Sequence, residues 1–165
     1  MLRLGVGLAL LLWLAASAHA ATSFASELSL GGALRTLYQT PVGGGELNLA
    51  IGGERDVVAG YFTISTFVGA TPLRLLTAQF QFGGLVQARL GRVRVGGGIS
   101  IGAMVVRRVT TEDLIDSFVA GVFAQASVDL VTQPQPIFLV LRLGADTLWP
   151  SFVFDGFLGV GTRFH

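Results

Sequence analysis

The sequence contains no cysteine and no lysine, and only 13% of its 165 residues are charged. An average soluble protein has about 25% charged residues. The lack of cysteine excludes a disulfide framework and a lipid-bearing cysteine after an export signal. Without residues 1–20 the chain keeps ten arginines and ten Asp or Glu residues, so its formal net charge is zero. Because nucleic-acid binding needs several basic contacts to phosphates, we expect no nucleic-acid partner.

Long apolar runs are also missing beyond residue 20, although 52% of all residues are hydrophobic and the mean hydropathy is +0.67. A spanning helix would need about 18 or more consecutive apolar residues, and glycines and polar residues interrupt every such segment here. Histidine is scarce as well, since His165 is the only one after residue 20. A Ser-His arrangement for general-base catalysis is therefore excluded, and we expect no enzyme activity, cofactor or metal site.

The first 20 residues predict a cleaved secretory signal peptide. A positive charge at Arg3 precedes an apolar stretch over 4–16, and Ala18-His19-Ala20 forms a small-x-small cleavage site. The alternative, a retained anchor helix, is less favoured because the apolar core is short and no cationic flank follows it. Residues 21–165 are then expected to form a single domain.

From Ser23 onward, apolar and polar residues alternate with the period of two that is typical of β-strands. Turn residues such as Gly, Pro and Asp divide the alternation into eight segments. We expect strands near 24–37, 45–53, 57–68, 74–89, 92–107, 116–131, 137–147 and 151–165. The short connections imply antiparallel neighbours. The predicted fold is all-β, a closed antiparallel up-and-down transmembrane β-barrel of about eight strands.

The two faces of these strands differ in bulk as well as in polarity. One face carries Leu, Ile, Val and Phe, whereas the other carries Gly, Ser, Gln and the charged residues. An eight-stranded barrel is just wide enough inside for side chains, so we place the small, polar face inside and the bulky face against lipid. The alternative is a soluble periplasmic lipocalin-like barrel that binds an apolar ligand, but its water-facing side would be rich in Lys and Glu.

The polar face predicts a network of ion pairs and hydrogen bonds inside the barrel, because buried charges are tolerated only when they are paired. The residues expected in it are Glu27, Arg35, Glu46, Gln79, Gln81, Arg89, Arg92, Arg94, Gln125, Asp129, Arg142, Asp146, Asp155 and Arg163. The sequence leaves open which acid pairs with which arginine. A filled interior is favoured over a conducting one, with a narrow pore or transporter for a small solute as the alternative.

On this pattern, residues 21–165 resemble the small eight-stranded outer-membrane β-barrels of the OmpA and OmpX type. The last segment, from Phe152 to His165, is similar to the C-terminal signal by which the barrel assembly machinery recognises these proteins. The signal residues are Phe152, Phe154, Leu158, Val160 and Phe164, with Phe164 penultimate where the family usually ends in an aromatic residue. The resemblance implies a monomer in the outer membrane of a Gram-negative bacterium, in contact with lipid and transiently with that machinery. Its implied role is structural or at the envelope surface.

Overall fold

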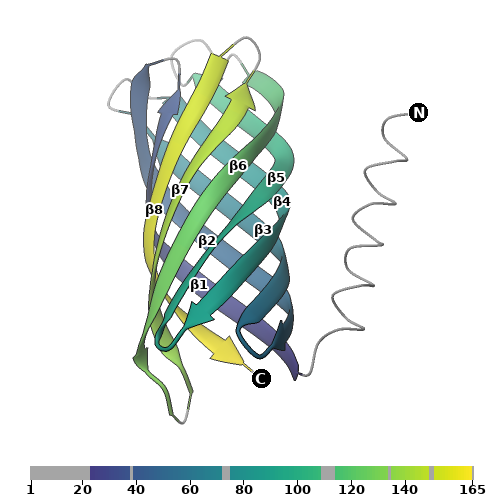
Figure 1. Cartoon of the computed structure of the whole chain (residues 1–165). Helices are drawn as coiled ribbons and strands as arrows, with labels where there is room; N and C mark the ends of the chain where they lie inside the picture. Colours follow the sequence, from purple (N-terminus) through teal and green to yellow (C-terminus); the bar gives the residue numbers. More distant parts are fainter. Residues whose placement is uncertain are drawn as a thin grey trace, which may run out of the picture.

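Eight antiparallel strands form the described part of the chain. The computed structural model describes residues 23–37, 39–71, 75–108, 114–133, 135–148 and 151–164. The strands are β1 (Ser23–Leu37), β2 (Thr40–Arg55), β3 (Val58–Ala70), β4 (Leu75–Leu90), β5 (Val93–Arg108), β6 (Leu114–Val131), β7 (Ile137–Leu148) and β8 (Ser151–Phe164). Each strand pairs with the next, and β1 pairs with β8 to close the barrel (Figure 1). The predicted closed, antiparallel, up-and-down barrel is confirmed.

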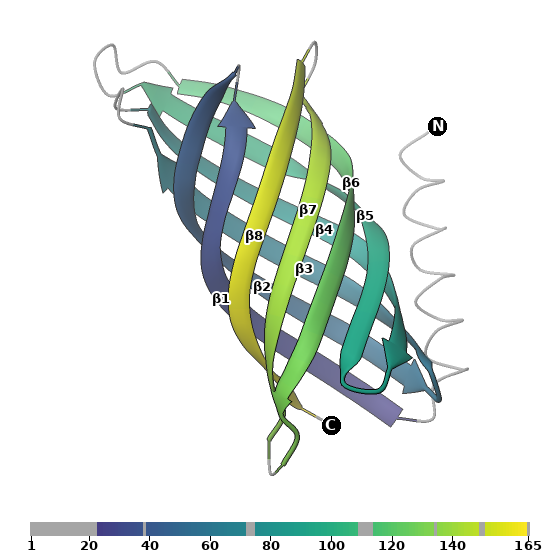
Figure 2. The same ribbon diagram turned by 60° about the vertical axis from the view of Figure 1, so that its left-hand side comes forward.

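The two ends of the barrel differ in what they carry. The start of β1, the end of β8 and the β2–β3, β4–β5 and β6–β7 turns lie at one end, which we call the terminal end (Figure 1). The other four connections lie at the opposite end, the loop end. Figure 2 shows that the β6–β7 hairpin extends beyond the other turns at the terminal end. The predicted signal peptide, residues 1–20, and His165 lie outside the described residues. Within the described ranges, no helix is long and apolar enough to cross a membrane.

The start of β2 corrects one predicted boundary. The strand begins at Thr40, whereas the sequence predicted a turn there and a strand start at residue 45. The reason is that Leu37 already pairs with Thr40, so the chain reverses direction within two residues. Pro41 is tolerated because β2 pairs with β3 only from Gly43 onward, which leaves Pro41 with a strand partner on one side.

The end of β2 corrects a second boundary. The sequence predicted a turn at 53–55, but β2 continues to Arg55, which pairs with Val58. The chain turns through the two residues between them, and Asp56 takes a positive φ of 50°, a conformation that Asp tolerates better than most residues. Glu54 therefore lies in the strand and not in a turn.

Burial alternates along the strands as the predicted faces require. On β8, for example, Phe152, Phe154, Leu158 and Val160 are exposed, while Val153 and Phe157 are buried. The buried polar or charged side chains on the inward face are Glu27, Ser29, Arg35, Glu46, Ser65, Thr77, Gln79, Gln81, Gln87, Arg94, Ser100, Ser127, Asp129, Arg142, Asp146 and Arg163. Most large apolar side chains thus point away from the barrel, although Phe67, Phe138 and Phe157 point into it, and most of the charge points inward.

Glycines on the inward face make room for carboxylates on the neighbouring strand. Gly121 pairs with Asp146, and a Cβ at Gly121 would collide with the Asp146 side chain. Gly144 pairs with Asp155 in the same way, and a Cβ there would lie 2.5 Å from the Asp155 Oδ1. A narrow barrel can hold these acids because the facing positions carry no side chain.

The interior is not polar throughout, because apolar side chains fill it close to the loop end. They flank the β1–β2, β5–β6 and β7–β8 connections at that end and share one buried cluster. We call them the apolar cap: Leu37, Val42, Val106, Val119, Leu148 and Val153. Such a layer excludes water from the polar side chains that lie deeper in the barrel.

Candidate functional site: the barrel interior

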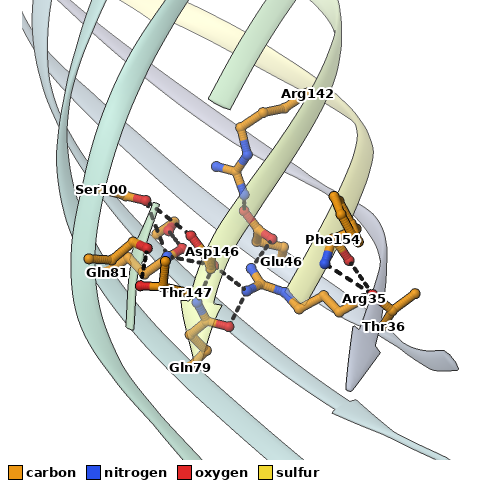
Figure 3. A network of polar contacts seen from close by, with 12 residues as sticks. Arg35, Thr36, Glu46, Gln79, Gln81, Ser100, Arg142, Asp146, Thr147 and Phe154 are labelled. Atoms are coloured by element: carbon orange, nitrogen blue, oxygen red, sulfur yellow. Dashed lines mark hydrogen bonds and ion pairs between the residues drawn. The ribbon is translucent and has the colours of Figure 1, made fainter. Parts of the chain in front are cut away.

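One group of interior side chains lies on the loop side of the barrel, below the apolar cap, and is centred on Glu46 (Figure 3). The Glu46 side chain is fully buried, and its Oε2 accepts a hydrogen bond of 2.8 Å from Arg35 Nη2. Its second oxygen accepts a hydrogen bond from Arg142 Nη2. Arg142 also donates to the side-chain oxygen of Asn48, at 2.8 Å. A single carboxylate from β2 therefore holds two arginines, one from β1 and one from β7.

Asp146 on β7 is the second acceptor of this group. Its Oδ2 accepts hydrogen bonds of 2.9 Å from the Nε2 atoms of both Gln79 and Gln81. Ser100 lies 3.5 Å from its Oδ1, and Arg35 Nη1 lies 3.8 Å from Oδ2. Arg35 in turn donates to the side-chain oxygen of Gln79, which connects the two acceptors. We call Arg35, Glu46, Asn48, Gln79, Gln81, Ser100, Arg142 and Asp146 the loop-side cluster.

A second group lies closer to the terminal end and joins the first strand to the last. Arg163 on β8 donates from Nε to Glu27 Oε1 at 2.6 Å and from Nη1 to Asp129 Oδ1 at 3.0 Å. Arg94 donates to Glu54 and lies 3.8 Å from Glu27. Both guanidinium groups are almost completely buried.

Tyr61 completes this second group. Its hydroxyl donates to Glu54 Oε1 at 2.5 Å and accepts a hydrogen bond of 3.2 Å from Arg94 Nη1. We call Glu27, Glu54, Tyr61, Arg94, Asp129 and Arg163 the terminal-side cluster. A salt bridge buried this deeply needs further hydrogen bonds to offset desolvation, and the tyrosine supplies two of them.

Phenyl rings on the inward face cover three of the interior guanidinium groups. Arg35 lies over Phe67, with 4.4 Å between its Cζ and the ring centroid, and Arg163 lies over Phe138 at 5.0 Å. Arg142 lies between two rings, 5.5 Å from Phe123 and 5.6 Å from Phe157. Cation–π contacts stabilise a desolvated guanidinium by up to about 2 kcal/mol each. The rings also occupy volume that water would otherwise fill.

Of the fourteen residues predicted for the network, ten belong to one of the two clusters and four do not. Arg89 and Arg92 are exposed at the terminal end, and the side chain of Arg89 donates to the carbonyl oxygen of Gly91 instead. The prediction failed for this pair because alternation assigns a face but does not show where the enclosed interior ends. Asp155 is half-buried and its Oδ1 accepts no hydrogen bond, while Gln125 is half-buried and lines a cavity.

The sequence reasoning missed Glu54, Tyr61, Asn48 and Ser100 as members of the network. Glu54 was assigned to a turn, although it has the same parity as Glu46 and Asn48 along β2. Tyr61 has the inward parity of β3, and its hydroxyl was the available signal, because a buried tyrosine usually finds a hydrogen-bond partner. A parity count carried to the end of β2 would have found Glu54, whereas Asn48 and Ser100 lie in the bodies of β2 and β5, where alternation already assigns them the inward face.

Two small cavities lie beside the loop-side cluster, and the second of them also reaches Glu27 of the terminal-side cluster. One, of about 10 Å³, is lined by Ser65, Gln81, Ser100, Phe123, Asp146 and Asp155, among others. The other, of about 20 Å³, adjoins Glu27, Asn48, Phe123, Gln125 and Arg142. Each is large enough for roughly one water molecule. Among the described residues, no group of three or more His, Cys, Asp or Glu is arranged to hold a metal ion.

The side chains predicted to form the assembly signal lie on the outer face of β8. Phe152, Phe154, Leu158, Val160 and Phe164 are all exposed, between 45% and 65%. The backbone N–H of Phe154 donates to Thr36 Oγ1 at 3.0 Å, so the β1–β8 seam has a side-chain contact on its outer face as well (Figure 3). The signal residues thus form an apolar ridge on β8, one of the two strands that close the barrel, with Gly156 and Thr162 between them.

No family model and no characterised protein sequence matches this chain. Several solved structures, however, align with it in three dimensions. Neisserial surface protein A aligns with a TM-score of 0.61 and 14% identity over 85% of this chain and 95% of its own. The attachment invasion locus protein Ail of Yersinia pestis aligns with a TM-score of 0.64 and 13% identity, over 87% of this chain and all of its own. The N-terminal β-barrel domain of Pseudomonas aeruginosa OprF aligns with a TM-score of 0.55 and 11% identity, over 85% and 97%. The chain therefore has the fold of the small eight-stranded outer-membrane β-barrels, as its sequence pattern predicted.

Proposed function

We propose that this chain is an integral outer-membrane protein of a Gram-negative bacterium, with a closed interior and a structural or envelope-surface role without catalysis. The observation that carries the proposal is the distribution of side chains, which is inside out relative to a soluble protein. Every strand exposes large apolar side chains on its outer face, such as Leu34, Ile99, Val122, Leu141 and Leu158. A soluble monomer rarely exposes a contiguous apolar patch larger than about 600 Å², whereas here the apolar residues surround the whole barrel. Lipid is the solvent that suits such a surface.

The hydrogen bonding of the backbone also suits a lipid environment. Lipid cannot hydrogen-bond to free N–H and C=O groups, so only helices and closed barrels can cross it. The pairing of β1 with β8 satisfies the backbone groups of the two strands that would otherwise be edges. A closed barrel also offers no free edge for pairing with a second copy, which supports the monomer that we propose.

The contents of the interior favour a filled barrel over a pore. Ion-paired clusters on the loop side and the terminal side cross the lumen, and the apolar cap lies above them. Two cavities that adjoin these clusters hold about one water molecule each. A lipocalin-like soluble barrel would need a charged outer face, whereas the outer face found here is apolar.

The length of the connections at the loop end helps to distinguish a structural role from adhesion. None of the four is longer than five residues, counted between the ends of the flanking strands. Ail is described as an attachment invasion locus protein and has been crystallised with the heparin analogue sucrose octasulfate. Connections this short give a partner little surface to bind, so we favour a structural role in the envelope over adhesion. We further propose that the apolar ridge of β8 is recognised by the barrel assembly machinery, as expected for a C-terminal signal.

Heat modifiability tests the membrane assignment. Residues 21–165, refolded into detergent micelles, should migrate faster on SDS gels before boiling than after it, and should give a β-rich far-UV circular dichroism spectrum. A variant that ends at Leu148 provides the control, because without β8 the barrel cannot close and no shift is expected. In cells, the protein should sediment with outer-membrane vesicles and resist carbonate extraction. A soluble periplasmic protein that shows no mobility shift would overturn the proposal.

A further inference from the structure

Three exposed arginines lie together at the terminal end of the barrel, outside the interior network. Arg55 is the last residue of β2, Arg89 lies next to the end of β4, and Arg92 lies in the β4–β5 turn. The backbone N–H of Arg89 donates to the carbonyl oxygen of Val57 at 2.7 Å. The β2–β3 and β4–β5 turns are therefore direct neighbours, and both lie at the end that carries the termini (Figure 2).

Little negative charge competes for these arginines. Among the described residues, Asp56 is the only exposed acid at this end. The nearby carboxylates of Glu27, Glu54 and Asp129 point into the barrel, where Arg94 and Arg163 bind them. In the part of the chain that the structure describes, the local surface thus keeps a net positive charge. Arg89 uses its Nε to donate to the carbonyl oxygen of Gly91, which leaves its two Nη groups for an anion from outside.

Exposed apolar side chains surround the arginines. Val57 and Val58 lie beside Arg55, and Leu90 and Val93 flank the β4–β5 turn; their exposed fractions range from 40% to 64%. Arginine next to exposed aliphatic residues at the rim of an apolar wall suits a membrane boundary. There the aliphatic groups contact acyl chains, while the guanidinium groups reach the headgroups.

We propose that Arg55, Arg89 and Arg92 form a binding site for the phosphate headgroups of anionic phospholipids in the leaflet at the terminal end of the barrel. The guanidinium group is the side chain best suited to bidentate hydrogen bonding with phosphate. This assignment rests on the proposed membrane location and adds to it a preferred lipid class. It also accounts for two arginines that were predicted to lie in the interior and do not.

Spin-labelled lipids test the site directly. A protein of residues 21–165 is refolded into phosphatidylcholine vesicles that contain a trace of spin-labelled phosphatidylglycerol or of spin-labelled phosphatidylcholine. Electron paramagnetic resonance then gives the fraction of each label that the protein immobilises. We expect about a fivefold preference for phosphatidylglycerol, which corresponds to the ~1 kcal/mol that one arginine contributes near an anionic surface. The preference should decrease as the salt concentration rises.

Matched variants show whether the lipid preference comes from these three arginines or from the net charge of the whole protein. The triple variant R55Q/R89Q/R92Q should lose the preference, and R55K/R89K/R92K should keep most of it. R107Q removes an exposed arginine at the loop end and should leave the preference unchanged. The assignment is overturned if the triple glutamine variant keeps the preference or if R107Q loses as much. If the unmodified chain immobilises neither label and shows no heat-modifiable band, the proposed membrane location fails together with the site.

Discussion

Replacing Glu46 with alanine removes a buried carboxylate that Arg35 and Arg142 share. Breaking a buried ion pair by deleting one partner costs about 3–5 kcal/mol, because the remaining charge is left uncompensated. Here each arginine keeps another contact, since Arg35 still donates to Gln79 and Arg142 still donates to Asn48. We therefore expect E46A to lower the free energy of unfolding by the amount for one pair, about 3–5 kcal/mol, and not by twice that amount.

Equilibrium urea unfolding of the barrel in vesicles, followed by far-UV circular dichroism, measures this loss. E46Q keeps an acceptor oxygen and the side-chain volume, so it should cost less, about 1–3 kcal/mol. D116N removes an exposed acid from β6 and should change the free energy of unfolding by less than about 0.5 kcal/mol. R142M should also cost less in the E46A background than in the original chain, with a coupling free energy of about 1–3 kcal/mol. A loss below about 1 kcal/mol for E46A would refute a central role of this carboxylate in the interior.

Three further predictions concern packing and environment. G121A should lower the free energy of unfolding by about 1–3 kcal/mol, because its Cβ collides with the carboxylate on the next strand; G32A, where a Cβ meets nothing within 4 Å, is the control. V122R, at the middle of the apolar wall, should cost about 2–4 kcal/mol in vesicles and L90R, at the rim, about 0–1; equal values would contradict a membrane-spanning wall. F123A should cost about 3 kcal/mol, because the ring lines both cavities and covers a guanidinium group. Planar bilayer recordings of F123A should still show no conductance steps, since both polar clusters remain, and stable steps would show that this ring is what blocks the lumen.

The fold was predictable because side chains that alternate with a period of two leave each strand only one choice, namely which of its two faces points inward. Once bulky apolar residues occupy one parity in strand after strand, the narrow interior of an eight-stranded barrel decides which face points inward. The same alternation placed Glu46, Asp146 and Arg163 inside, where they are buried. Each of these residues lies in the body of its strand, where parity and burial coincide.

The ends of the strands were harder to predict, and so were the ion pairs. Arg89 and Glu54 show the two kinds of error, since the first lies beyond the enclosed interior and the second was assigned to a turn. Pairs such as Arg142 with Glu46 join β7 to β2, two strands that are not neighbours in the barrel. Contacts across the lumen depend on the stagger of the whole sheet, which local alternation does not contain.

Because β1 pairs with β8, the barrel can close only when the chain from β1 through β8 is present. Glu27 and Arg163 face each other in the seam and form an ion pair, although 136 residues separate them in the sequence. A chain terminated before β8 would leave β1 with an unpaired edge and Glu27 without its closest cation. Such a product could not close the barrel, and its β1 edge would be open to pairing with another chain. Only a chain translated through Arg163 can satisfy both ends of the sheet at once.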